Sequence, residues 1–550
     1  MSLFFACHGE DATTSESDEA TTSELNDGSN GRARSRKDAS APDSATTSDS
    51  STVPDSSTIP DSSTAADAAT VIDSSGTSTT STLSVELQPQ VASTAVRRIN
   101  FAVPLAPGAL TSVDRIQVRA GGTVLPTARR ALASWPDGSI RSVQVQFDLA
   151  VPATTSVGVT VGETASSTIA MVPVDQTLTQ ADGTTGPAVW ALLPAGWLSS
   201  SRVAGPSLPS AQVAGTAQAA WDRVCDYAAF GTDAFLPIDG EQGSWLFDRP
   251  TAFYRGYQRT GSLTPLRSAY REAAMYRAGI TGTASSTTIP VPASSGDLKY
   301  HYTQGLAIHY LLTGDDRFRE AAENVAIRAH DLWTSPGYAG GSDFWTERHA
   351  GFSLLAYEWA AAVSDDRAAL FTGWASDAAS AYLSVQATYP AGYTSATERC
   401  FAHSAEAHGE SYGYFGCSPW MSAILADGLD AHADRLATSG NASGAQAART
   451  SLVKLGTFIA KQGRDATGRP LYWAGVGVTS DEADVYDEHW GESAYVVALA
   501  WHWSGKTNAT LRQAADALVS GLDTRGEAGQ LRSFNWQCRS GVMAPFYLQP

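Results

Sequence analysis

The second half of the chain repeats one pattern: an apolar run with helical spacing, a glycine-centred break, and a second run that opens with polar residues. Glycine is common just after a helix, and polar side chains are common in a first turn. The pattern occurs at residues 254–269, 309–322 and 501–515. Helical hairpins repeated at intervals of tens of residues predict a stacked or closed helical array.

Helical spacing extends over residues 221–550, and its clearest predicted helices cover residues 269–276, 318–332, 352–362, 445–461 and 494–503. We expect about five or six hairpins here, which is sufficient for an (α/α) toroid. Such a ring gathers loops and helix starts at one end, around a groove that suits a long polymer. Helical arrays also include non-catalytic scaffolds, so the architecture alone does not predict an enzyme.

Upstream, the period of the apolar positions changes to two. Apolar and polar residues alternate at residues 99–103, 112–119 and 141–148. Gly121-Gly122 and Pro136-Asp137-Gly138 supply turns between these runs. We therefore expect a small antiparallel β-barrel or sandwich over residues 93–175, followed by a linker or bridging strands over residues 176–220. The fold class is multidomain α+β.

The first 92 residues are rich in Ser, Thr, Asp and Ala, and residues 59–64 nearly copy residues 53–58. Such a segment buries too little apolar surface to offset its chain entropy, so we expect a disordered tether. Cys7 follows Leu-Phe-Phe-Ala, which looks like the end of a bacterial lipoprotein signal. We therefore expect an exported protein, extracellular or held at the outer membrane or cell surface by a lipid on Cys7.

The other four cysteines are Cys225, Cys400, Cys417 and Cys538. Their even number is compatible with two disulfides in an exported protein. Cys400 and Cys417 are close enough in sequence to be partners, although the pairing stays open. Cysteine and histidine spacing does not suggest zinc, and no Asp-rich calcium loop is evident. We expect no metal and no cofactor, with Ca²⁺ as an open alternative.

The net charge of −19 and the pI near 4.9 argue against nucleic acid and anionic membranes as partners. The 15 tryptophans and 19 tyrosines fit either a large helical core or a carbohydrate cleft, where flat rings stack on sugars. No apolar run of about 18 residues or more, as a membrane span needs, occurs in the sequence. We expect a monomer.

A resemblance to a known family rests on two phrases of the β-region. Residues 101–110 read Phe-Ala-Val-Pro-Leu-Ala-Pro-Gly-Ala-Leu, and residues 135–141 read Trp-Pro-Asp-Gly-Ser-Ile-Arg. They resemble the N-terminal RIFT-type β-barrel of the exo-rhamnogalacturonan lyase-like family. The resemblance implies a catalytic α/α toroid over residues 221–550 and a polysaccharide lyase. The chain departs from the family in one respect, since residues 173–221 leave no room for a middle β-sandwich.

β-Elimination in a uronate-containing polysaccharide needs a cation or amide that neutralises the carboxylate, a base, and an acid for the leaving oxygen. Arg, His and Tyr supply these functions, and they gather in four clusters, at residues 299–304, 343–349, 398–414 and 484–492. The predicted catalytic residues are His408, Tyr412, His349, Arg348, Tyr486 and His489. The predicted substrate-binding residues are Tyr302, Trp245, Trp345, Arg399, Glu410, Trp420 and Trp490. The expected partner is an anionic polysaccharide.

Several of these residues have a structural alternative. Glu347 and Arg348 fit a helix-start capping pair, and His349 fits a core histidine bonded to a carbonyl. Tyr486 and Trp490 are one turn apart and can simply pack. The histidines within helical patterns (His309, His330, His432 and His502) are interpreted as structural.

Two other functions stay open. Many α/α rings hydrolyse glycosidic bonds with two carboxylates, and Glu347 or Asp343 with Glu410 or Asp487 could serve. The third hypothesis is a non-catalytic glycan-binding surface lipoprotein that uses tryptophans as platforms.

Overall fold

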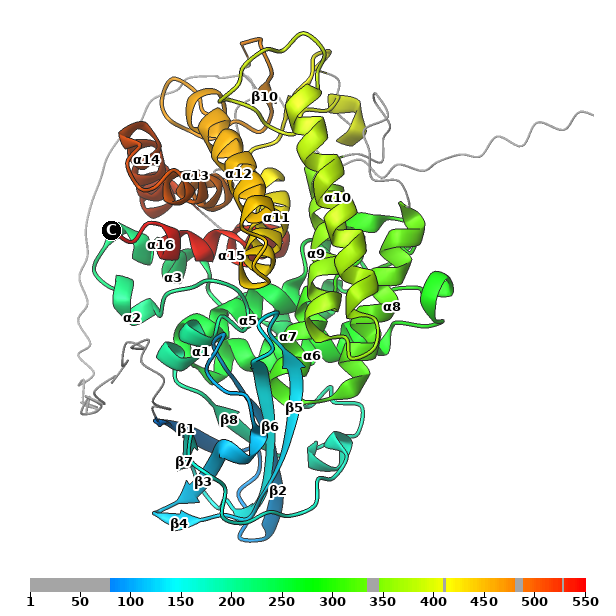
Figure 1. Cartoon of the computed structure of the whole chain (residues 1–550), viewed down its shortest axis with the longest axis vertical. Helices are drawn as coiled ribbons and strands as arrows, with labels where there is room; N and C mark the ends of the chain where they lie inside the picture. Colours follow the sequence, from blue (N-terminus) through cyan, green and yellow to red (C-terminus); the bar gives the residue numbers. More distant parts are fainter. Residues whose placement is uncertain (1–79, 334–345, 409–411, 480–487, 527–528) are drawn as a thin grey trace, which may run out of the picture. The chain divides into compact units, whose positions relative to one another are not determined.

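Strands and helices separate along the chain as the two periodicities predict. The computed structural model describes residues 80–333, 346–408, 412–479, 488–526 and 529–550. Residues 67–550 form one compact unit, with antiparallel strands first and helices afterwards (Figure 1). The fold is therefore mixed α+β, as expected. The predicted tether up to residue 79 lies outside the described residues.

Two antiparallel sheets make up the β-region. One has five strands in the order β4-β3-β7-β1-β8, and the other has three in the order β2-β6-β5. Their strands are β1 (Ser81–Pro89), β2 (Val96–Pro104), β3 (Ile116–Ala120), β4 (Thr123–Val124), β5 (Thr127–Ser134), β6 (Ile140–Ala150), β7 (Thr155–Val161) and β8 (Val189–Leu192). A small pair, β9 (Gly416–Cys417) with β10 (Ala474–Gly475), lies within the helical region.

Two predicted boundaries need correction. Strand β1 lies inside the range predicted to be tether. Its residues Leu83, Val85 and Leu87 alternate with polar residues and are buried, and the strand pairs with β7 on one side and β8 on the other. Strand β8 likewise belongs to the same sheet, although it falls in the predicted linker. The predicted strand at residues 112–119 begins as a 3₁₀ turn (Val113–Arg115), which the Ser112 side chain caps.

Helices occupy most of the chain after residue 194. They are α1 (Ala195–Ser201), α2 (Ser210–Val213), α3 (Ala220–Val224), α4 (Thr232–Phe235), α5 (Arg249–Thr260), α6 (Leu263–Ala278), α7 (Gln304–Thr313), α8 (Asp316–Leu332), α9 (Glu347–Val363), α10 (Ala368–Thr388), α11 (Ser422–Thr438), α12 (Ala442–Gln462), α13 (Trp490–Trp503), α14 (Ala509–Arg525), α15 (Leu531–Arg539) and α16 (Ala544–Tyr547). All five clearest predicted helices fall within α6, α8, α9, α12 and α13.

The helices form two classes by burial. Helices α5, α7, α9, α11 and α13 are buried along nearly all of their length, whereas α6, α8, α10, α12 and α14 bury one face. The buried helices contact one another in this order, and α15 contacts both α13 and α5, so the series closes on itself. Each buried helix also packs against the amphipathic helix that follows it.

The predicted glycine breaks end α5 and α7. Gly261 and Gly314 adopt φ values of +66° and +73°, a left-handed conformation that glycine enters without a steric cost. Contacts join the segments before the buried helices: Asp297, before α7, lies 3.3 Å from His349 of α9, and Ser418, before α11, donates to Glu347 of α9. Trp420, before α11, stacks on His489, just before α13, so the described residues of the predicted clusters lie at one end of the helical region.

The β-region packs against α7. Asn100 Nδ2 donates to the Thr313 carbonyl at 2.8 Å, and Ser142 Oγ donates to the Leu311 carbonyl at 2.6 Å. Tyr310 returns a hydrogen bond from its hydroxyl to a carbonyl of β5 at 2.6 Å. These bonds join the C-terminal end of a buried helix to two strands, opposite the end that carries the predicted clusters.

Two disulfides tie distant segments together. Cys225 pairs with Cys538 over 313 residues, and Cys400 pairs with Cys417 over 17 residues. The structure thus confirms the two predicted disulfides. None of the described helices combines the length and the apolar character that a bilayer crossing requires.

Candidate functional site

Aromatic rings from three segments meet around Trp420. The imidazole of His489 stacks on the Trp420 indole at 4.7 Å between ring centroids, with 7° between the planes. Trp536 and Tyr472 lie 5.5 and 5.9 Å from the same indole. We call Trp420, His489, Arg348, Tyr472 and Trp536 the Trp420 cluster. It joins residues that precede α11 and α13 to the first turn of α9 and to α15.

Arg348 brings a positive charge to the Trp420 cluster. Its guanidinium carbon lies 5.8 Å from the Trp420 ring centroid, and the residue is 9 % exposed. In the part of the chain that the structure describes, no carboxylate pairs with Arg348, and its buried Nε has no hydrogen-bond partner. A buried charge without a counter-ion is costly, so this position fits an anionic ligand.

His489 has a carboxylate beside it. Nδ1 of the imidazole lies 3.5 Å from Oε1 of Glu492, one turn further along α13, and both side chains are almost fully buried. A carboxylate next to one ring nitrogen favours the proton on that nitrogen and the lone pair on the other. The 3.5 Å contact is longer than a hydrogen bond, so the Glu492 carboxylate acts on the imidazole as a neighbouring charge.

His349 has its ring nitrogens engaged on both sides. Nδ1 lies 2.6 Å from the hydroxyl of Thr346, which also caps α9, and Nε2 lies 3.3 Å from Oδ1 of Asp297. Burial lowers the pKa of His349 to about 4, although the Asp297 carboxylate acts in the opposite direction. His349 thus joins the start of α9 to the segment before α7. Because Arg348 is the preceding residue of α9, these contacts also fix the backbone from which the Arg348 side chain extends.

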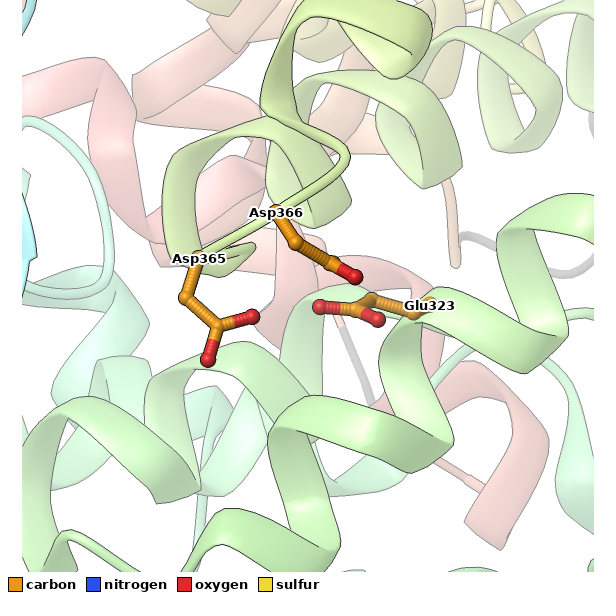
Figure 2. A group of neighbouring side chains, drawn as sticks. All are labelled: Glu323, Asp365 and Asp366. Carbon is orange, nitrogen blue, oxygen red and sulfur yellow. The ribbon is translucent and has the colours of Figure 1, made fainter.

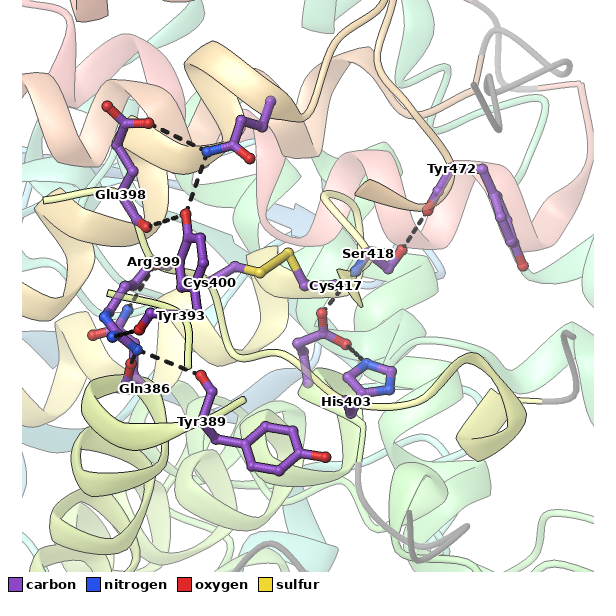
Figure 3. Close-up of a disulfide and its surroundings, with 12 residues drawn as sticks. Gln386, Tyr389, Tyr393, Glu398, Arg399, Cys400, His403, Cys417, Ser418 and Tyr472 are labelled. Atoms are coloured by element: carbon purple, nitrogen blue, oxygen red, sulfur yellow. Dashed lines mark hydrogen bonds and ion pairs between the residues drawn. A yellow bond between two sulfur atoms is a disulfide. The ribbon is translucent and has the colours of Figure 1, made fainter. Parts of the chain in front are cut away.

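Glu347 is occupied by the protein itself. Its two oxygens accept from the Ser418 backbone N–H at 2.7 Å and from His403 Nε2 at 2.6 Å, and its side chain is fully buried. Figure 3 shows His403 and Ser418 beside Cys417, at one end of the disulfide to Cys400. The disulfide and the Glu347 carboxylate together hold the segment before α11, which carries Trp420.

Tyr412 lies on a second aromatic group next to this disulfide. Its ring is 6.2 Å from Tyr414 and 6.1 Å from Trp473, and the residue is partly exposed. Trp473 in turn contacts the His403 ring at 4.9 Å. The phenol of Tyr412 is therefore connected to the start of α9 through Trp473, His403 and Glu347.

Tyr302 is almost fully buried and connects to the Trp420 cluster through Phe352 and Phe247. It packs on Phe352 of α9 at 5.0 Å and on Tyr276 at 5.6 Å. Burial raises the pKa of the Tyr302 phenol well above its usual value, so this phenol is neutral. Phe247, just before α5, stacks on Phe352 at 5.6 Å and lies 5.9 Å from Trp420. These ring contacts pack the segment before α5 against the Trp420 cluster.

Three predicted substrate-binding residues have structural roles in the described part of the chain. Arg399 donates to the carbonyls of Ser395 at 2.6 Å and Gln386 at 2.9 Å, so it holds the loop drawn in Figure 3. Trp245 is 6 % exposed and donates from Nε1 to a carbonyl at 2.7 Å. Trp490 is 1 % exposed and packs between α13 and α14. These are the contacts within the protein that the structure gives to the three residues.

Other predicted residues lie outside the described residues. These are Trp345, Glu410 and Tyr486, together with the side chain of His408, and Asp343 and Asp487 of the hydrolase alternative. Of the remaining six, Arg348, His349, Trp420 and His489 come together at the starts of α9, α11 and α13, and Tyr412 lies on the aromatic group beside the Cys400–Cys417 disulfide. Tyr302 lies close to them through Phe352 and Phe247.

Three members of the site were not predicted: Tyr472, Trp536 and Glu492. Tyr472 follows a Gly-Arg-Pro turn and precedes another aromatic residue, a signal that could have been noticed. Trp536 lies in α15, whose place beside α5 and α13 only the tertiary structure reveals. Glu492 is one turn after His489, and its role depends on the direction in which the imidazole points.

Three carboxylates, from α8 and from the α9–α10 connection, have the spacing of a cation site. Figure 2 shows Glu323, Asp365 and Asp366 with their carboxylates turned toward one another. Arg319 contacts both Glu323 at 3.5 Å and Asp365, and Arg367 lies 3.5 Å from Glu323. These two arginines offset most of the negative charge of the three carboxylates, so we interpret the group as a salt-bridge network between α8 and the α9–α10 connection.

No protein-family model matches the chain, and no curated protein sequence does either. The chemistry of the site is therefore argued from its own residues.

Proposed function

We propose that the protein is a polysaccharide lyase that cleaves a uronic-acid-containing polysaccharide by β-elimination. The observation that carries the proposal is Arg348, a buried cation without a carboxylate partner among the described residues, beside an imidazole and two tryptophans. Carboxylate recognition is a task to which the arginine fork is well suited. Tryptophan faces are suited to sugar rings.

The reaction needs three functions. A base takes the proton from the carbon that bears the carboxylate, and the electrons of that C–H bond form a new C=C bond. The C–O bond on the next carbon breaks, its electron pair stays on the leaving oxygen, and an acid protonates that oxygen. A cation near the carboxylate stabilises the enolate-like charge that develops between these events.

The described residues supply these functions as follows. Arg348 binds the carboxylate. His349 is the positioning residue of Arg348, because its contacts with Thr346 and Asp297 fix the start of α9. His489 is the base, with Glu492 as its positioning residue. Tyr412, which the sequence predicts as a catalytic residue, is assigned as the acid, and Tyr472 is a second phenol beside the cluster.

The arrangement of the helices supports the proposal. The closed series of contacts from α5 through α15 fits an (α/α) toroid, and the site lies at the end where the buried helices start. The two phrases of the β-region fit a RIFT-type barrel in the same chain. An exported, lipid-anchored protein with this activity would act on polysaccharides outside the cell.

Hydrolysis is less well supported in the described part of the chain. Of the carboxylates named for it, Glu347 has both oxygens bonded to Ser418 and His403 within the core. A hydrolytic pair needs one carboxylic acid that donates to the bond and one carboxylate that reaches the opposite face. Glu347 does not offer either function without breaking the bonds that hold the segment before α11.

The test is a screen of anionic and neutral polysaccharides with two readouts. Elimination leaves a conjugated C=C bond that absorbs near the ultraviolet edge, and either reaction creates reducing ends. We expect both signals on a polyuronate and neither on its neutral counterpart. Reducing ends without the absorbance would assign a hydrolase, and binding without new ends would assign a glycan-capturing protein.

Variants then connect the activity to the site. Arg348→Ala should lower kcat/KM at least about 100-fold on the polyuronate, because the developing charge loses its counter-ion. Arg525→Ala is the matched control, since Arg525 also lies over a tryptophan (Trp490, 4.3 Å) but outside the Trp420 cluster. Equal losses in the two variants would remove Arg348 from the mechanism.

A further inference from the structure

A cavity of about 460 Å³ lies between the β-region and the C-terminal halves of α9 and α11. The loop between β5 and β6 contributes Trp135, β6 contributes Arg141, and α9 contributes Trp359. We call this cavity the Arg141 pocket. Its volume is within the range of about 300–1,000 Å³ that is typical of small-molecule sites.

The Arg141 guanidinium lies between two indoles. Its central carbon is 4.3 Å from the Trp135 ring and 5.2 Å from the Trp359 ring. Stacking occupies the faces of a guanidinium and leaves its N–H donors directed outward in the plane, where a carboxylate can accept two hydrogen bonds. Burial lowers the pKa of Arg141 to about 10, so the group remains cationic at neutral pH.

Two acidic residues of the pocket already have cationic partners. Glu358 accepts from Arg435 Nε at 2.7 Å and pairs with His432 at 2.6 Å. Asp427 pairs with Arg255 at 2.9 Å. These contacts hold α5, α9 and α11 around the pocket, and the Glu358 carboxylate also acts on Arg141 through space, without forming an ion pair with it.

The other two acidic residues are also engaged. Asp430 accepts from Trp503 Nε1 at 3.0 Å and from the Tyr547 hydroxyl, and burial raises its pKa to about 7. Asp434 pairs with Arg202 at 3.3 Å. Among the charged residues that line the pocket, Arg141 is thus the one whose guanidinium has no ion pair and no hydrogen bond to the protein.

The rest of the lining combines apolar and hydroxyl groups. Pro107, Pro136 and several alanines form walls, and Ser134 and Thr372 add hydroxyls. Trp359 Nε1 is buried without a hydrogen-bond partner. An unpaired cation with aromatic rings, apolar walls and hydroxyls matches a sugar that carries a carboxylate, because a sugar presents C–H faces and hydroxyl edges together.

We propose that the Arg141 pocket binds a small acidic saccharide, with its carboxylate on Arg141. The pocket is separate from the Trp420 cluster: Arg348 and Trp359 are 11 residues apart on α9, a rise of about 16 Å at 1.5 Å per residue. This assignment rests on the pocket alone and stands whether or not the chain is a lyase.

Titration calorimetry of the full chain tests it, with D-galacturonate, D-galactose and inorganic phosphate as probes. We expect galacturonate to bind at least about tenfold more tightly than galactose or phosphate, because only it offers both the carboxylate and the ring. Arg141→Gln should abolish this difference. Arg119→Gln, a β-region arginine paired with Glu163 instead, should leave it unchanged.

Two further variants guard against a folding defect. Ala362→Phe fills the pocket and keeps Arg141, so it should also abolish the Arg141-dependent binding of galacturonate, whereas Arg525→Ala, over Trp490 and outside the pocket, should bind galacturonate as the parent does. Equal binding of all three probes, binding that survives both Arg141→Gln and Ala362→Phe, or no binding of galacturonate would overturn the proposal. A polysaccharide screen without cleavage would contradict the lyase and leave this pocket unaffected.

Discussion

Three buried histidines have pKa values below the usual value for histidine, because burial disfavours the protonated imidazole. Burial lowers the pKa of His301 and His349 to about 4 and that of His309 to about 3, from 6.5. His301 Nδ1 contacts the Asp297 carbonyl at 2.9 Å, and His309 Nδ1 contacts the Tyr254 hydroxyl at 2.6 Å. Their folded-state pKa values are depressed, so the unfolded chain binds more protons below pH 6.5.

The free energy of unfolding should therefore fall as the pH decreases from about 6.5 toward 4. Each histidine contributes about 2 kcal/mol of this loss between pH 7 and pH 5, since one pKa unit corresponds to about 1.4 kcal/mol. Urea unfolding of the parent and of His309→Gln at both pH values measures it. A variant with the same pH dependence as the parent would contradict the assignment of His309.

A substitution of Tyr412 tests the assignment of this residue as the acid. Tyr412→Phe should lower turnover on the polyuronate at least about 100-fold with little change in melting temperature, as expected for a proton-transfer role. Tyr414→Phe is the matched control, because its ring lies 6.2 Å from Tyr412 and is also partly exposed. Near-normal turnover in Tyr412→Phe would leave Tyr472 as the remaining phenol of the site.

At the scale of elements, the crossing of α9 and α11 depends on glycine. A Cβ at Gly351 would lie 2.6 Å from backbone atoms of Ile424 and Leu425, which cannot move as a side chain can. Gly373 in α10 has open space around the same position. The two residues therefore form a matched pair within neighbouring helices.

Gly351→Ala should destabilise the protein by several kcal/mol, because α9 and α11 must separate; overpacking typically costs about 1–3 kcal/mol or more. Gly373→Ala should stabilise it by about 0.5–1 kcal/mol, since alanine is the better helix former. Chemical denaturation of both variants measures the difference. Because α9 and α11 also carry Arg348 and Trp420, Gly351→Ala should lose activity in parallel.

At the scale of the whole molecule, the two disulfides differ in what they restrain. Cys225–Cys538 spans 313 residues and joins α3 to α15, whereas Cys400–Cys417 spans 17 residues beside the site. In the chain-entropy model, closing these loops stabilises the fold by about 6 and about 3 kcal/mol.

Replacing both cysteines of the longer loop by serine should therefore lower the free energy of unfolding about twice as much as replacing those of the shorter loop. The shorter loop should instead show the larger effect on kcat, because His403 and Ser418 hold Glu347 there. Denaturation and kinetics of the two double variants check both statements. The reverse ranking in activity would separate this disulfide from the site.

Local periodicity was sufficient for the five clearest helices and for the glycine breaks after α5 and α7, but it missed β1 and β8. Gly314 acts on its neighbours in sequence, so its effect can be read along the chain, whereas Leu83 and Val85 of β1 pair with residues of β7 more than 70 positions away. The clusters before the buried helices could be placed along the chain by the same local pattern. The pairing of His403 with Glu347 could not, because those residues are 56 positions apart.

The sequence by itself determined the α+β order and the clearest helices, and it predicted that clusters of ionisable and aromatic residues precede the helices. Only the tertiary structure decided which of these groups are satisfied by the protein and which are left for a ligand. In the part of the chain that the structure describes, Glu347 and Arg399 are hydrogen-bonded within the protein, whereas Arg348 and Arg141 lie over tryptophan rings and make no ion pair. The physical reason is that hydrogen bonds and burial depend on contacts between segments that are far apart in the chain.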